Sequence, residues 1–196
     1  DSTCPVDFVT GSLFPYSRQH LSSLLSQDDL GEVLKPLLQE VQVAWKQEED
    51  PAAPPFSNQQ APLALLPYLQ WLIDQDRKLA PLKELQGLTW RHGYHSGALT
   101  TPLFDDVAPA LKHWQQLGLR LAVYSSGSVA AQQLFYGHTR DGDLTGLFER
   151  WYDTRLGPKK ETKSYEQLAI DLQLTPKAVL FISDASAELA AARAAG

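Results

Sequence analysis

The sequence contains no methionine, a single cysteine and no long apolar run. The lone cysteine, Cys4, cannot form an internal disulfide, which fits a reducing, cytoplasmic compartment. No stretch approaches the ~20 apolar residues that a membrane-spanning helix needs, and no secretory signal is visible, so we expect no membrane partner. Because methionine is absent even at the first position, we expect that this chain has been processed or truncated.

Positive charge is also scarce. The chain carries 17 Lys and Arg residues against 23 Asp and Glu residues, which gives a formal net charge of -6. No basic stripe is present, so nucleic acid is not an expected partner. An acidic chain can still bind a phosphate group where cations gather locally. The 196 residues, 43% of them hydrophobic, allow one core with an appended part, and we expect a monomer.

The most informative stretch covers residues 119–128. Its apolar first part, residues 119–124, is typical of a buried strand, and Ser125-Ser126-Gly127-Ser128 and a helical pattern follow it. A strand, a small polar turn and a helix start together form a candidate anion site. The first N–H groups of a helix lack partners within the helix, and the helix dipole favours negative charge there. An ordinary helix cap remains the alternative, because serine is a preferred cap.

The two halves of the chain differ in pattern. Residues 10–100 show helical periodicity and no convincing strand, and the charged run from Lys46 to Asp50 is interpreted as a solvated helix end. After residue 100 the pattern alternates helix, strand, helix, strand, helix, which is typical of a parallel α/β layout. The last strand is expected at residues 178–182, and residues 148–154 could add a short one.

Four polar side chains lie at or near expected strand ends in this second half. Ser125 and Ser126 follow the first strand, Lys159 lies in a charged loop, and Asp184 follows the last strand. Because the carboxyl ends of parallel strands meet at one edge of a sheet, we expect these side chains to converge. Lys159 supplies a point charge for a phosphate group, and Asp184 supplies a hard oxygen ligand that suits Mg²⁺.

Together these residues predict a phosphoryl-transfer pocket, in which positioning and charge neutralisation do most of the work. Glu161 is expected to orient Lys159, and Lys159, as an exposed loop residue, is expected to contribute little to folding. Each residue alone has an ordinary alternative, since surface lysines are usually solvated and an Asp after a strand is often a turn residue. The ordered set at matching strand ends is more specific than any one member.

The order of hydroxyl turn, lysine loop and strand-ending aspartate resembles the haloacid dehalogenase-like hydrolases. The resemblance is closer to one branch, the enolase-phosphatases (acireductone synthases) of methionine salvage, and it spans nearly the whole chain. The segments that carry it are Leu13-Phe14-Pro15-Tyr16, Asp76-Arg77-Lys78, Leu82-Lys83-Glu84-Leu85-Gln86-Gly87, Tyr124-Ser125-Ser126-Gly127-Ser128 with Ala131-Gln132, Gly137-His138, Tyr152-Asp153-Thr154, Lys159 with Glu161, Ser164-Tyr165 and Phe181-Ile182-Ser183-Asp184.

The resemblance implies an α/β fold with a Rossmann-like parallel sheet core, formed by residues 1–9 and 101–196, and an inserted all-helical cap at residues 10–100. It implies a Mg²⁺-dependent phosphatase with enolase activity. The substrate would be 2,3-diketo-5-methylthiopentyl-1-phosphate, a small phosphorylated diketone, which is enolised and then dephosphorylated to an acireductone. Ser125 and Ser126 would bind the phosphate, Lys159 would act as catalytic and substrate-binding cation, and Asp184 would bind Mg²⁺.

The resemblance also implies a nucleophilic Asp that forms an aspartyl-phosphate. The family places this residue in Asp-Ile-Glu-Gly-Thr-Thr, whereas this chain opens Asp1-Ser2-Thr3-Cys4-Pro5. Either Asp1 is the nucleophile, or the nucleophile lies upstream of it. Two alternatives therefore remain, a generic haloacid dehalogenase-like phosphatase of small phosphate esters and a non-catalytic protein that binds a phosphorylated metabolite.

Overall fold

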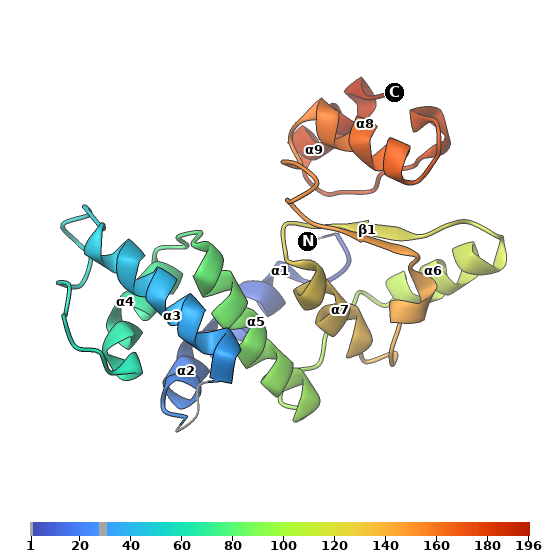
Figure 1. Cartoon of the computed structure of the whole chain (residues 1–196). Coiled ribbons are helices and arrows are strands. Elements are labelled where there is room, and N and C mark those ends of the chain that lie inside the picture. Colours follow the sequence, from blue (N-terminus) through green and yellow to red (C-terminus); the bar gives the residue numbers. More distant parts are fainter. Residues whose placement is uncertain (1, 28–30) are drawn as a thin grey trace. The chain divides into compact units, whose positions relative to one another are not determined.

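The computed structural model describes residues 2–27 and 31–196. The chain divides into two compact units, one formed by Asp1–Phe8 with Thr100–Gly196 and the other by Val9–Leu99. The first is an α/β unit and the second is helical (Figure 1). Among the described residues, no helix of either unit has both the length and the apolar character needed to cross a membrane.

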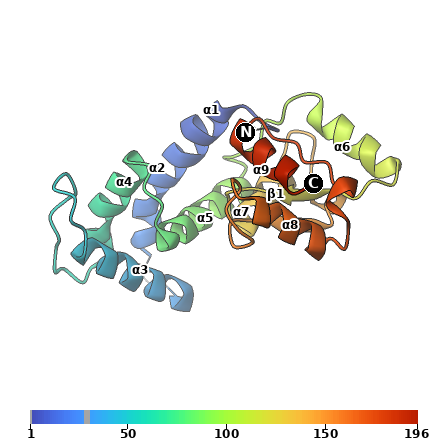
Figure 2. The ribbon, with the colours of Figure 1, turned by 90° about the horizontal axis from the view of Figure 1, so that it is seen from above.

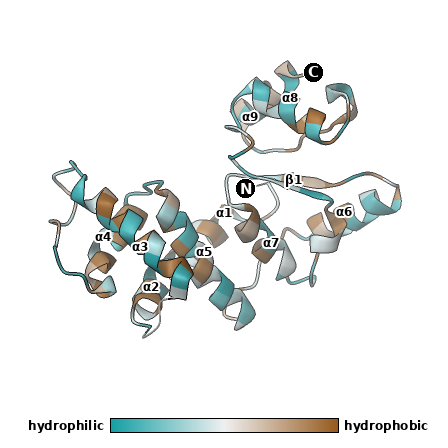
Figure 3. Ribbon diagram, in the orientation of Figure 1, coloured by the Kyte–Doolittle hydropathy of each residue, from teal (hydrophilic) through white to brown (hydrophobic). Residues whose placement is uncertain are grey.

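The described part of the helical unit contains helices and no strand, as predicted. Its elements are η1 (Val9–Leu13), α2 (Phe14–Leu25), α3 (Gly31–Lys46), η2 (Pro62–Leu65), α4 (Leu66–Asp74) and α5 (Ala80–His95). Apolar and polar residues lie on different sides of these helices (Figure 3). The apolar sides form one core cluster, in which Leu21, Val41, Leu69 and Leu85 are fully buried. Burial of such amphipathic faces, rather than intrinsic propensity, supplies most of a helix's stability.

The charged run after α3 is only partly solvated, which corrects the interpretation from sequence. The Glu48 side chain is 9% exposed and lies 3.2 Å from the Arg77 guanidinium. It also accepts a hydrogen bond from the Tyr68 hydroxyl at 3.0 Å. Burial, followed by the contact with Glu48, raises the pKa of Tyr68 to about 12. This polar network joins the end of α3 to α4 and to the segment before α5.

The α/β unit is built around two short parallel strands, β1 (Ala122–Tyr124) and β2 (Arg150–Tyr152). They confirm two of the predicted strands over shorter spans. The helical elements of the unit are α1 (Val6–Phe8), α6 (Val107–Gln116), α7 (Val129–Gly137), η3 (Thr145–Leu147), α8 (Thr162–Asp171), η4 (Pro176–Ala178) and α9 (Ser186–Ala194). In the view from above, α8 and α9 lie side by side (Figure 2).

The strand pair is covered on both faces. In the register of the pair, Val123 lies opposite Trp151, and Tyr124 lies opposite Tyr152. Val123 and Trp151 pack against the cluster that contains Tyr136 of α7. Tyr124 and Tyr152 pack on the other side against Leu168 of α8. Because successive side chains of a strand point to opposite faces, this alternation gives the layered α/β core that the sequence predicted.

The last strand was predicted wrongly. Residues 176–178 form the 3-10 turn η4, and residues 179–182 have no ladder partner among the described residues. The segment keeps the alternation of a strand, since Leu180 is 84% and Ile182 57% exposed while Val179 and Phe181 are half-buried. An apolar run alone does not make a strand, because the backbone also needs a neighbour with which to form hydrogen bonds.

Cys4 is buried in the core of the α/β unit, at 2% exposure beside Leu103 and Tyr136. Burial raises the pKa of its thiol. The thiolate is the reactive form of cysteine, so this residue serves packing rather than nucleophilic chemistry.

At two glycines of α5, substitution by alanine should change the free energy of unfolding in opposite directions. A Cβ at Gly93 would lie 2.7 Å from Leu99 Cδ1 and 2.8 Å from the Tyr16 ring, whereas a Cβ at Gly87 meets nothing within 4 Å. Leu99 is buried and Tyr16 is stacked on His20, so neither can move aside freely. Gly93→Ala should lower the free energy of unfolding by about 1–3 kcal/mol.

Gly87→Ala is the matched control and should raise that free energy by about 0.5–1 kcal/mol, because alanine is the better helix former. Urea unfolding followed by circular dichroism measures both. Equal effects of the two substitutions would contradict the close packing at Gly93.

Candidate active site

The turn after β1 is fixed by its own serines. Ser125 N–H donates to the Tyr152 carbonyl oxygen at 3.0 Å and so extends the strand pairing by one residue. The Ser125 hydroxyl oxygen accepts from Gly127 N–H at 3.2 Å. Ser128 caps α7, because its hydroxyl oxygen accepts from Ala131 N–H at 3.2 Å. The turn therefore contains the helix cap that the sequence offered as the alternative to an anion site, and anion binding stays a prediction. The N-terminus of α7 lies at the carboxyl end of β1.

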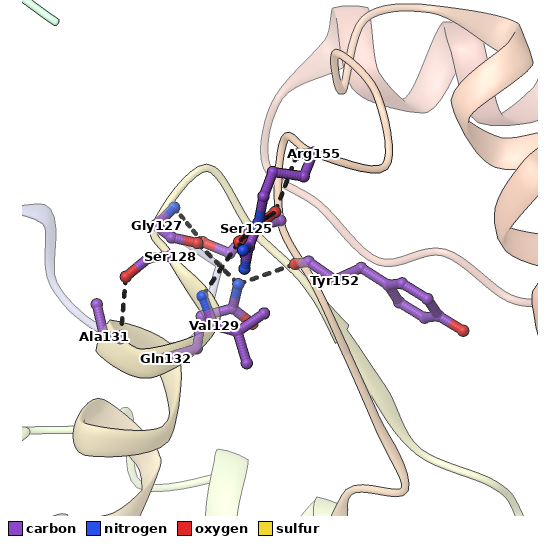
Figure 4. A network of polar contacts seen from close by, with 9 residues as sticks. Ser125, Gly127, Ser128, Val129, Ala131, Gln132, Tyr152 and Arg155 are labelled. Atoms are coloured by element: carbon purple, nitrogen blue, oxygen red, sulfur yellow. Dashed lines mark hydrogen bonds and ion pairs between the residues drawn. The ribbon is translucent and has the colours of Figure 1, made fainter. Parts of the chain in front are cut away.

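A second set of contacts holds this turn to the end of β2, and the sequence analysis gave it no role. The Gln132 side-chain nitrogen donates to the carbonyl oxygens of Gly127 and Tyr152, both at 2.8 Å (Figure 4). Asp153 directly follows β2, and its carboxylate accepts from Val129 N–H at 3.3 Å. Asp153 follows a strand just as Asp184 follows an apolar run, so the rule that selected Asp184 could have selected Asp153.

The Asp153 carboxylate is 7% exposed and is neutralised by Arg155. The Arg155 guanidinium donates to both carboxylate oxygens, with Nη2 2.7 Å from Oδ2, and Arg155 N–H donates to Oδ1 at 2.9 Å. These contacts lower the pKa of Asp153 against the opposing effect of burial. The carboxylate therefore stays charged, and it caps the first turn of α7.

Lys159 lies inside a cluster of side chains rather than in solvent, which corrects its expected exposure. Its side chain is 19% exposed, and Nζ lies 2.7 Å from Glu188 Oε2. Nζ also lies 5.9 Å from the centroid of the Tyr124 ring, within the range of a cation–π contact. The partner of Lys159 is thus Glu188 of α9, and the expected role of Glu161 was wrong.

Glu188 was missed from sequence because it is separated from Lys159 by 29 positions and from Asp184 by a turn and the start of a helix. Its side chain is 13% exposed. The same oxygen that contacts Lys159 accepts from the Ser183 hydroxyl at 2.8 Å. Glu188 therefore joins the lysine loop to the residue that precedes Asp184.

Asp184 is exposed at the end of the extended segment. Its carboxylate accepts from the Ser2 hydroxyl at 2.9 Å, and Asp184 N–H donates to the same hydroxyl oxygen at 3.1 Å. Within residues 2–27 and 31–196 there is no group of three or more His, Cys, Asp or Glu side chains that could enclose a metal ion. Mg²⁺ takes one or two carboxylates and completes its shell with waters and substrate phosphate, so Asp184 fits as one ligand but is not a site alone. Asp1, one of the two positions at which the nucleophile is expected, lies outside the described residues.

The predicted residues are linked by a continuous path of contacts. Ser125 follows Tyr124, and the Tyr124 ring lies beside the Lys159 ammonium. Glu188 connects that ammonium to Ser183, which directly precedes Asp184. Ser126 is exposed on the turn. The contacts therefore connect the turn after β1, the lysine loop and the segment that ends at Asp184, and binding of a phosphoryl group there stays a prediction.

Proteins of similar sequence identify the family of the chain. Residues 17–196 match the model of the haloacid dehalogenase-like hydrolases. The chain is 80% identical over 195 residues to Enolase-phosphatase E1 of Synechococcus sp. strain RCC307, covering 100% of this chain and 78% of the relative. It is 44% identical over 193 residues to Enolase-phosphatase E1 of Acidiphilium cryptum, covering 98% of this chain and 76% of that protein.

The chain belongs to the enolase-phosphatase E1 family of haloacid dehalogenase-like hydrolases. The crystal structure of the UTR4 protein of Saccharomyces cerevisiae is similar to this structure, with a TM-score of 0.79 and 30% sequence identity. The match covers 100% of this chain and 82% of the UTR4 chain. The predicted fold class is thereby confirmed.

Asp153 predicts how acid affects the stability of this family member. The pKa of the Asp153 carboxyl is lower in the folded protein than in the unfolded chain, where it lies near 4. Such a carboxyl stabilises the fold at a pH above its pKa in the unfolded chain. This stabilisation is lost as the pH falls through its pKa in the folded protein. Between pH 5 and pH 3, the unaltered protein should therefore lose more of its free energy of unfolding than the Asp153→Asn variant loses. Thermal unfolding at several pH values measures the difference.

Asp141→Asn, at an exposed position of the same unit, is the control and should retain the full acid dependence of the unaltered protein. Identical acid profiles for the unaltered protein and Asp153→Asn would show that Asp153 does not carry this effect.

Proposed function

We propose that this protein is an enolase-phosphatase that enolises and then dephosphorylates 2,3-diketo-5-methylthiopentyl-1-phosphate. The products are an acireductone and phosphate, within methionine salvage. The observation that carries this proposal is the 80% identity to Enolase-phosphatase E1 along the whole chain. Function belongs to a site rather than to a fold, so the contacts near Ser125, Lys159 and Asp184 are the second support.

The turn after β1 binds the substrate's phosphate in this proposal. The Ser125 oxygen accepts from Gly127 N–H, and its own O–H proton can then donate to a phosphate oxygen. Ser126, exposed on the same turn, supplies a second hydroxyl. Lys159, already ordered by Glu188, neutralises charge on the transferring group. Charged groups fixed in advance stabilise developing charge without reorganisation at the moment of reaction.

Asp184 would hold Mg²⁺ as one of its ligands. When bound, Mg²⁺ neutralises charge on the phosphoryl oxygens. The Ser2 hydroxyl orients the Asp184 carboxylate, and Ser183 links the same segment to Glu188. The nucleophilic carboxylate, expected at Asp1 or upstream of it, completes the proposal. Residues 1–9 with 101–196 would act as the catalytic core, and residues 10–100 as its cap.

We further propose that the protein acts as a cytoplasmic monomer on this small molecule, without nucleic acid. The single cysteine and the net charge of -6 support the compartment and the absence of a nucleic-acid partner.

A phosphate-release assay on the full-length protein tests the proposal, with the diketone phosphate as substrate, with and without Mg²⁺. Appearance of the acireductone chromophore, followed separately, reports the enolisation step. Phosphate release from p-nitrophenyl phosphate as fast as from the diketone would favour a generic phosphatase. Binding of the diketone phosphate without release of phosphate would favour a non-catalytic binder.

Lys159→Ala should reduce turnover by about 100-fold or more, since it removes a charge that neutralises the phosphoryl group. It should also reduce stability by about 1–3 kcal/mol, because the Glu188 carboxylate, 13% exposed, is left unpaired. Steady-state kinetics and thermal unfolding measure the two effects.

The double variant Lys159→Ala with Glu188→Gln separates them. It should recover most of the lost stability, since the unpaired charge is gone, while turnover stays low. Recovery of turnover in the double variant would contradict the role of the lysine charge.

Asp184→Asn should raise the Mg²⁺ concentration needed for half-maximal activity by at least about tenfold, because an amide is a weaker ligand than a carboxylate. A magnesium titration of phosphate release measures the shift. Asp105→Asn, at an exposed position of the same unit, should leave the titration unchanged. An unchanged titration for Asp184→Asn would remove Asp184 from the metal site.

A further inference from the structure

A buried amide lies directly under the turn to which the proposed function assigns phosphate binding. Gln132 of α7 is 5% exposed although its side chain is polar. Its nitrogen donates to the carbonyl oxygens of Gly127 and Tyr152, each at 2.8 Å (Figure 4). Burying an amide costs free energy unless it forms hydrogen bonds, so these two contacts determine how the side chain is held.

Only the nitrogen of the Gln132 amide forms hydrogen bonds within the described residues. Its oxygen, Oε1, is buried and has no hydrogen-bond partner among the described residues. A buried acceptor in this state costs about 1–3 kcal/mol, so a glutamine here is a poor choice for stability alone. Departures from local rules of this kind are expected where a residue serves function. The nitrogen forms both hydrogen bonds of the side chain, so any role of Gln132 in the site depends on what those two bonds hold in place.

The two carbonyl groups that Gln132 holds have different positions in the site. Gly127 lies within the turn, directly after Ser125 and Ser126, the two serines proposed to contact phosphate. Tyr152 ends β2, and its carbonyl oxygen also accepts from Ser125 N–H at 3.0 Å. A carbonyl oxygen has two lone pairs and can accept two hydrogen bonds. The Tyr152 oxygen accepts one from Ser125 N–H, at the start of the turn, and one from the Gln132 amide. The start of the turn therefore bonds directly to the Tyr152 oxygen, and Gly127 is connected to the same oxygen through the Gln132 amide.

The direction of the Gly127 carbonyl decides whether the turn suits an anion. Backbone N–H groups attract a phosphate oxygen, whereas a carbonyl oxygen aimed at the same place repels it. Gln132 draws this carbonyl into the protein, toward the buried side of α7. Gly127 N–H donates to the Ser125 oxygen, which leaves the Ser125 hydroxyl proton available to donate to another acceptor.

We infer that Gln132 is a positioning residue of the phosphate-binding turn, whose side-chain amide holds the Gly127 and Tyr152 carbonyl groups so that Ser125 faces the bound phosphate. This inference rests on the proposed function of the turn. Gln132 acts through Ser125 and does not itself touch the substrate.

Gln132→Met tests the inference, because methionine has a similar volume and lacks the donor. The inhibition constant of inorganic phosphate and the KM for the diketone phosphate should each rise about tenfold, as expected if the bound phosphate loses one hydrogen bond, that from Ser125. Direct binding of inorganic phosphate, measured by calorimetry in the presence of Mg²⁺, should weaken to the same extent. Gln133→Met, at the next and exposed position of α7, should match the unaltered protein in all three.

Gln132→Asn provides a second variant, since it keeps the amide but shortens the side chain by one methylene. It should bind phosphate with an affinity between those of the unaltered protein and Gln132→Met. If both variants lose thermal stability but keep the phosphate affinity of Gln133→Met, Gln132 is merely structural and the inference is overturned.

The proposed function and the inference can fail separately. Phosphate binding that weakens in both Gln132 variants, without turnover of the diketone by the unaltered protein, would reject the substrate and support the positioning role. Turnover of the diketone by the unaltered protein, with phosphate binding unchanged in the variants, would support the substrate and reject the positioning role. Absence of phosphate binding by the unaltered protein would overturn both.

Discussion

The parallel pairing of β1 with β2 is the constraint on which the candidate site depends. The register places Tyr124 opposite Tyr152, so the chain leaves both strands at the same edge. Ser125 and Asp153 are the next residues, and each forms hydrogen bonds that reach the N-terminal turn of α7 or its approach. Because parallel strands need a crossover connection, α7 returns across one face of the pair while its N-terminus remains at that edge. The strand pairing and the turn proposed to bind phosphate are thus one structural feature.

Two carboxylates of low exposure, Asp153 and Glu188, lie close to the place proposed for phosphate. An unpaired negative charge there would repel a phosphate group and would be costly to bury. Each carboxylate has a cation, Arg155 for Asp153 and Lys159 for Glu188. The first pair is local, since its residues lie two positions apart. The second joins a loop to α9 and therefore depends on the tertiary fold.

The sequence predicted features that local pattern determines. An apolar run followed by Ser125–Ser128 indicated the strand, the turn and the helix, and the structure has all three. Prediction from the sequence failed where a feature depends on residues far apart in the chain. The burial of Lys159 depends on Tyr124 and Glu188, and neither contact has a fixed spacing. Residues 179–182 have the composition of a strand, but pairing depends on a neighbouring backbone that composition does not reveal. Gln132 belongs to a segment that carries the family resemblance, but the helical pattern around it does not predict its hydrogen bonds to two carbonyl groups.

The contact between Lys159 and Glu188 has opposing consequences for catalysis. The Glu188 carboxylate offsets part of the positive charge that Lys159 presents to a phosphoryl group. It also orders a side chain that would otherwise lose about 1.5–2 kcal/mol of conformational freedom on binding substrate. The Tyr124 ring holds the ammonium from another side, and the Ser183 hydroxyl shares the Glu188 oxygen, which weakens the pull of Glu188 on Lys159. A cation held in this way is already positioned when a dianionic phosphate arrives, and the phosphate's larger charge can then compete with one shared carboxylate.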